Sequence, residues 1–143
     1  MNNIIRKYNY KLEIGTVGTD DDNIAQIIYA INQMEMYISN STNDLKELDG
    51  KLGKLYFLTV HSKVHLNRFY KIYYEKIKNE TFMEIINILD NMIEEIKANR
   101  YNENTEEIQN LENMERVFPV VYSKMLDIVP KILTLDAQAI GRT

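Results

Sequence analysis

Residues 55–66 read Leu-Tyr-Phe-Leu-Thr-Val-His-Ser-Lys-Val-His-Leu, and they determine whether we expect a sheet in the N-terminal half. Their aromatic and β-branched residues are types that strands favour. Every second residue from Leu58 to Leu66 shares one face of an extended chain, and all of these except Ser62 are apolar. The pattern predicts a strand or a hairpin over residues 55–66. Residues 67–78 fit both a helix and a strand, and we prefer the strand for the first half of this segment.

A second alternating segment lies at residues 8–14, Tyr-Asn-Tyr-Lys-Leu-Glu-Ile, where the alternation has no exception. It predicts another half-buried strand. Thr19 and Asp22 then have the spacing of a capping box at a helix start. Apolar residues at helical spacing follow, so we expect a helix over about residues 20–39. The polar segment 41–54 contains two glycines and predicts a surface connection.

The C-terminal half has helical periodicity throughout. Apolar residues from Phe82 to Ile96 form one continuous stripe, and a further helix is expected from about Thr105. Proline lacks the backbone donor that a helix interior needs, so we expect Pro119 to end or kink this helix and Pro130 to bend the last one.

These elements predict an α+β fold. A small antiparallel sheet of two to three strands, at about residues 8–14 and 55–74, would pack on helices and precede a helical C-terminal half. We expect one domain over residues 1–143, in which residues 1–78 continue into residues 79–143. So few strands are marginally stable alone, and the C-terminal helices are strongly apolar. A homo-oligomer or a protein partner is therefore expected.

The composition excludes several kinds of chemistry. The chain of 143 residues has no cysteine, which excludes disulfides, thiolate metal sites and a cysteine nucleophile. The first residues lack the apolar run of a secretory signal, and no apolar stretch is long enough to span a membrane. We expect a soluble, intracellular, cytoplasmic protein without membrane contact.

Candidate metal and phosphate sites are weak in this sequence. On a helix, His61 and His65 would share one face and could share a metal ion. On the expected strand they would lie roughly 13 Å apart, at about 3.3 Å per residue, too far for one ion. Gly15 and Gly18 do not fit a phosphate-loop motif, and three aspartates at residues 20–22 would repel a phosphate. We expect no metal, no cofactor and no catalytic residue, and favour a protein that is not an enzyme.

Charge is distributed unevenly along the chain. Residues 51–78 contain seven basic residues and one acidic residue, whereas residues 79–118 contain three basic and ten acidic residues. The two blocks could pair with each other, or the first could form a basic surface. Aromatic residues lie among the basic ones and could stack on bases. This alternative assigns ligand binding to Lys63, Arg68, Tyr70, Lys71, Tyr74 and Lys76.

Two functions follow from these patterns. The first is a non-catalytic interaction or assembly protein, homo-oligomeric, that docks partners through its apolar helices. The alternative is a binding protein for a phosphate-bearing ligand, a nucleotide or single-stranded nucleic acid, through residues 51–78.

Overall fold

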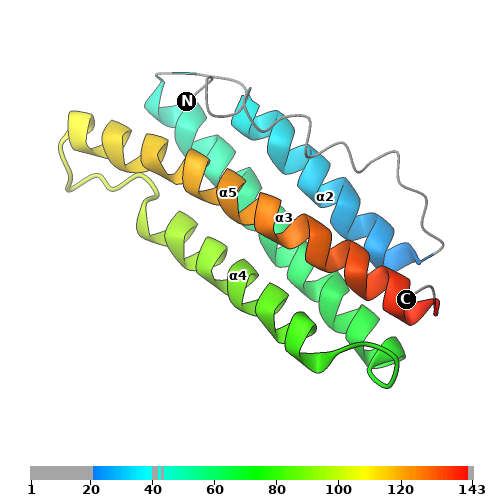
Figure 1. Cartoon of the computed structure of the whole chain (residues 1–143). Helices are drawn as coiled ribbons and strands as arrows, with labels where there is room; N and C mark the ends of the chain where they lie inside the picture. Colours follow the sequence, from blue (N-terminus) through cyan, green and yellow to red (C-terminus); the bar gives the residue numbers. More distant parts are fainter. Residues whose placement is uncertain (1–20, 40–41, 43, 142–143) are drawn as a thin grey trace.

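The computed structural model describes residues 21–39, 42 and 44–141, and within them it contains four α-helices and no strand (Figure 1). The helices are α2 (Asp22–Ser39), α3 (Leu45–Tyr73), α4 (Asn79–Ala98) and α5 (Glu107–Ala139). Successive helices run antiparallel, and α2 and α4 each pack against both α3 and α5. The described part of the chain is therefore an up-down-up-down four-helix bundle.

The predicted α+β fold is wrong for this bundle. Residues 55–73, assigned in the prediction to strands, lie within α3. The other predicted strand, residues 8–14, lies outside the described residues. The small antiparallel sheet is thus replaced by a helix of 29 residues.

The misassignment of α3 has a physical cause in the residues that it buries. Its core-facing side includes Thr59 and Ser62, whereas Phe57 and Val64 are exposed. The apolar pattern in the sequence therefore does not follow the buried face. Burial of the two hydroxyls is tolerated because each donates a hydrogen bond within the helix, from Thr59 to the carbonyl of Leu55 and from Ser62 to that of Leu58.

The start of α3 also differs from the prediction, because residues 45–54 are helical rather than a surface connection. The Asp44 carboxylate accepts hydrogen bonds from the backbone N–H groups of Lys46 and Glu47, which caps the helix. Buried Leu48 and Leu52 then anchor this segment in the core. Packing outweighs the helix-weakening effect of the two glycines in the same turns.

The other helices agree more closely with the sequence. The expected helix at 20–39 is confirmed over Asp22–Ser39, although the proposed cap at Thr19 lies outside the described residues. The stripe from Phe82 to Ile96 is the buried face of α4. Of the two effects expected of Pro119, ending a helix is wrong, because α5 continues through both prolines. A kink at Pro119 and a bend at Pro130 stay predictions. Buried residues lie on both sides of each proline and hold the helix in the bundle.

All four helices contribute to one hydrophobic core. Its largest fully buried side chains include Tyr122, Phe69 and Phe118. Most apolar residues of α4 and α5 are buried in this core. They are therefore not available for the docking of a partner that the sequence had suggested. None of the described helices is long and apolar enough to cross a membrane.

Candidate interaction surface on helix α3

Three large apolar side chains lie on the outer face of α3, the side that points away from the core. Phe57 is 68% exposed, Val64 is 42% exposed and Ile72 is 62% exposed. Their separations of seven and eight residues correspond to about two helical turns each, so they follow one side of the helix. At about 1.5 Å of rise per residue they are about 10 and 12 Å apart along the axis, so they form a spaced row on one side of α3.

Basic side chains lie on the same outer face. Lys54, Arg68 and Lys71 are exposed, and no ion pair joins them to a described acidic residue. We call these three residues, together with Phe57, Val64 and Ile72, the α3 outer face. It combines apolar contact area with positive charge that the bundle does not neutralise.

Two of the six residues in the predicted ligand site face α4 instead. Lys63 forms an ion pair with Asp90, at 2.6 Å between Nζ and Oδ1. The ring of Tyr70 stacks on Phe82 with centroids 4.1 Å apart, and its hydroxyl donates to the Asn79 side chain. Both side chains therefore join α3 to α4.

The other four residues of that predicted site are exposed. Arg68 and Lys71 belong to the α3 outer face, while Tyr74 and Lys76 lie where α3 ends. The structure thus brings Arg68 and Lys71 together and separates them from Lys63 and Tyr70. Binding of a phosphate-bearing ligand stays a prediction.

Pairing between the basic and acidic blocks of the sequence is partial. The ion pair of Lys63 with Asp90 joins the two blocks, but Lys54, Arg68 and Lys71 make no such pair. The uneven charge of the sequence therefore persists on the surface.

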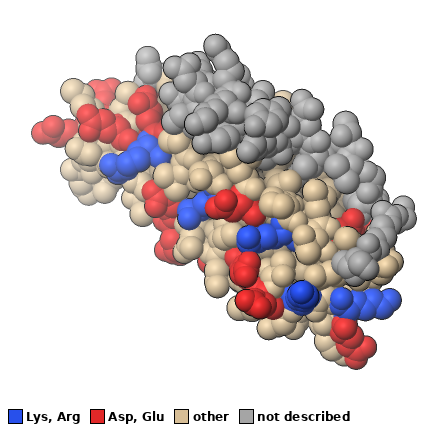
Figure 2. All heavy atoms as spheres, viewed as in Figure 1, with Lys and Arg blue, Asp and Glu red and all other residues tan. Residues whose placement is uncertain are grey.

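The opposite side of the bundle carries mixed charge. Figure 2 shows α4 and α5 toward the viewer, with acidic and basic side chains next to each other and a group of acidic ones where α5 begins. Glu106, Glu107 and Glu112 are exposed there. Ile108 lies among them and is 74% exposed. This acidic α5 start (Glu106, Glu107, Ile108 and Glu112) has the charge opposite to that of the α3 outer face.

The helical state of α3 also brings its two histidines together. The ring centroids of His61 and His65 are 4.4 Å apart, so the separation expected for a strand is wrong. Each ring contacts an amide oxygen of α2: Nε2 of His61 lies 3.2 Å from Oε1 of Gln26, and Nδ1 of His65 lies 2.8 Å from Oδ1 of Asn23. Burial, followed by the charges of His61 and Arg68, lowers the pKa of His65 below its usual value.

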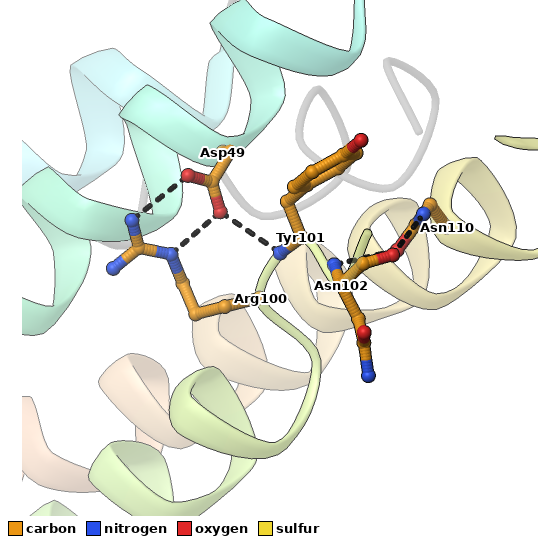
Figure 3. Close-up of polar contacts among 5 residues, drawn as sticks. All are labelled: Asp49, Arg100, Tyr101, Asn102 and Asn110. Carbon is orange, nitrogen blue, oxygen red and sulfur yellow. Dashed lines mark hydrogen bonds and ion pairs between the residues drawn. The ribbon is translucent and has the colours of Figure 1, made fainter. Parts of the chain in front are cut away.

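A polar cluster fixes the connection between α4 and α5 to the start of α3 (Figure 3). Arg100 donates two hydrogen bonds to the Asp49 carboxylate, at 2.7 and 2.9 Å, and the backbone N–H of Tyr101 donates a third. These bonds, chiefly that from Arg100, lower the pKa of Asp49, while burial opposes the shift. Gly53 lies beside Arg100, and a Cβ atom there would be 3.4 Å from the guanidinium.

Asn110 of α5 forms hydrogen bonds with the same connection between α4 and α5. Its side-chain oxygen accepts from the N–H of Asn102, and its amide donates to the carbonyls of Asn102 and Thr105. Asn110 is only 2% exposed. Because these groups satisfy one another, we assign a structural role to this polar cluster (Asp49, Arg100, Tyr101, Asn102 and Asn110).

The sequence pattern did not predict that the apolar residues of the α3 outer face are exposed. Val64 was assigned to the alternating strand, Phe57 was counted among the aromatic residues of the basic block, and Ile72 fitted both a helix and a strand. The detectable signal is their helical spacing, offset from the leucines at 48, 52 and 55.

A metal centre with several acidic or imidazole ligands is not evident in the part of the chain that the structure describes. No group of three or more His, Cys, Asp or Glu residues is placed there to hold one ion.

The chain was also compared with known proteins. No protein-family model, no curated protein and no solved structure matches it.

Proposed function

We propose that the chain is a non-catalytic interaction protein that assembles with further copies of itself through the α3 outer face. The observation that carries this proposal is the row of exposed apolar side chains, Phe57, Val64 and Ile72, among basic side chains that no ion pair joins to a described acidic residue. Contact with another protein surface would remove this apolar area from water, which stabilises the associated state.

The positive charge of the α3 outer face favours an acidic surface as its partner. Two copies of that face would bring Lys54, Arg68 and Lys71 against their own equivalents, and like charges across an interface disfavour association. The acidic α5 start offers carboxylates and one exposed apolar side chain, Ile108. We therefore assign the α3 outer face of one copy to the acidic α5 start of the next.

This arrangement has a definite symmetry. Each copy carries one α3 outer face and one acidic α5 start, so the contact joins two different surfaces. Contacts of this kind are heterologous, and they produce closed rings or open chains rather than isologous dimers. Assembly should also weaken as salt is added. The charged side chains of the α3 outer face and of the acidic α5 start are exposed, so dissolved ions screen their attraction.

Analytical ultracentrifugation across a range of concentrations tests the assembly. One variant blocks the α3 outer face (Phe57→Ser with Arg68→Glu), and another blocks the acidic α5 start (Ile108→Ser with Glu112→Lys). Each variant alone should be monomeric. An equimolar mixture should form a dimer of one copy of each, because each variant keeps the surface that the other has lost.

The control is Met83→Ser, which removes an exposed apolar side chain of α4 outside both surfaces. It should assemble as the unchanged protein does. A monomeric unchanged protein at all concentrations, or full assembly by both blocked variants, would refute the proposal. A monomer that binds a single-stranded oligonucleotide, and loses this binding with Arg68→Glu and Lys71→Glu, would instead support the phosphate-ligand alternative.

A further inference from the structure

His61 and His65 are the only histidines of the chain, and α3 places them on neighbouring turns. Their ring centroids are 4.4 Å apart and the ring planes are inclined at 59°, so the two rings are direct neighbours. An ion bound at about 2.0–2.1 Å in the plane of each ring would lie about 3 Å from each centroid, so the centroid separation is compatible with one ion bound by both rings. Both residues are half-buried and remain accessible to solvent.

Helix α2 leaves one nitrogen of each ring available. An amide oxygen can only accept a hydrogen bond, so Nε2 of His61 donates to Gln26 and Nδ1 of His65 donates to Asn23. In the neutral rings, Nδ1 of His61 and Nε2 of His65 then carry the lone pairs. Metal-binding histidines characteristically donate their other ring N–H to an oxygen in this way, which fixes the tautomer and the ring orientation.

We propose that His61 and His65 together chelate one divalent transition-metal ion, such as Cu²⁺, Ni²⁺ or Zn²⁺, with solvent in its remaining positions. Imidazole suits these ions, whereas Mg²⁺ and Ca²⁺ require oxygen ligands. Affinity for Cu²⁺ should exceed that for Ni²⁺ and Zn²⁺, following the usual order for nitrogen ligands. Asn23 and Gln26 are positioning residues, because they act through the rings.

This inference does not depend on the proposed assembly. The lone-pair nitrogens and their α2 partners belong to a single copy of the chain. Loss of the metal site would leave the α3 outer face intact, and a monomeric protein could still bind the ion.

Isothermal titration of the tag-free full chain with CuCl₂, NiCl₂ and ZnCl₂ tests the site. One ion should bind per chain, and His61→Ala or His65→Ala should abolish chelation. Asn23→Ala and Gln26→Ala should each weaken affinity about tenfold, the lower end of the usual range for such partners. Electron paramagnetic resonance of the Cu²⁺ complex should show two coordinated nitrogens.

A matched control keeps two imidazoles but separates them. His65→Gln combined with Arg68→His places the second ring two turns from His61 on the exposed side of α3, so both rings cannot share one ion. Circular dichroism checks that each variant remains helical. If the unchanged protein binds none of these ions more tightly than the control does, the proposal is wrong. If Asn23→Ala and Gln26→Ala bind as the unchanged chain does, the positioning role is wrong.

Discussion

The polar cluster and the α3 outer face both place charged groups of α3 near solvent, but they differ in how those groups are paired. Asp49 accepts three hydrogen bonds from the α4–α5 connection. Arg68 and Lys71 form no ion pair with any acidic residue that the structure describes, and they lie beside exposed apolar side chains. Polar groups that satisfy one another indicate a structural role, whereas unneutralised charge beside exposed apolar area is better explained by a partner.

The largest effect is expected at Asn110. Asn110→Ala would leave the N–H of Asn102 and the carbonyls of Asn102 and Thr105 without their partner. We expect the free energy of unfolding to fall by about 2 kcal/mol, measured by urea denaturation. Asn91→Ala, at an exposed position of α4, should change it by less than about 0.5 kcal/mol. Equal effects of the two variants would contradict a structural role for the cluster.

A smaller loss is expected at Asp49. Asp49→Ala would remove the acceptor of Arg100, in an ion pair whose side chains are 39% and 28% exposed. Solvent weakens such pairs, so we expect a loss of about 1 kcal/mol in the same measurement. Asp127→Ala, at an exposed position of α5, is the matched control and should have almost no effect. If Asp49→Ala lowers the free energy of unfolding no more than Asp127→Ala does, the ion pair between Asp49 and Arg100 does not stabilise the bundle.

Acid should weaken the ion pair between Asp49 and Arg100. The pKa of Asp49 is held below its usual value of 3.8, chiefly by the hydrogen bond from Arg100. The unfolded chain therefore binds the proton first, and the stabilisation present above the usual pKa is lost as pH falls through the lower pKa of the folded state. Denaturation at a series of pH values should show this loss, and Asp49→Asn should reduce it. An unchanged slope in that variant would exclude Asp49 as the source.

The smallest effect on stability is expected on the α3 outer face. Phe57→Ser replaces a side chain that is 68% exposed, and serine and phenylalanine have similar helix propensities. The free energy of unfolding of the monomer should change by less than about 0.5 kcal/mol. A loss as large as that for Asn110→Ala would show that Phe57 supports the bundle and would remove the contrast between the two regions.

The sequence predicted the helices whose buried faces are apolar. Residues from Phe82 to Ile96 and from Ile24 to Ile38 follow the period of a helix and lie in the core. In α5 the same periodicity outweighed the helix-ending effect expected of Pro119, because one helix continues through both prolines. Burial against three other helices is a long-range effect that a local rule about proline does not contain.

Helix α3 could not be predicted in the same way. Thr59 and Ser62 are buried and Phe57 and Val64 are exposed, so hydrophobicity alone favoured the wrong period. The contacts of His61 and His65 with α2 exist only when residues 55–66 are helical, so the strand prediction could not include them. The residues that misled the structural prediction include Phe57 and Val64, which belong to the surface now proposed for interaction.

The two faces of α3 have a consequence for how the chain folds. Before α2, α4 and α5 are in place, a collapsing chain can bury either Leu55, Thr59 and Leu66 or the opposite side with Phe57 and Val64. The second choice makes a helix with the correct backbone but the wrong rotation about its axis, a case of local frustration. Replacement of Phe57 by serine should therefore remove a slow refolding phase, if stopped-flow refolding of the unchanged chain contains one, and leave the unfolding rate unaltered.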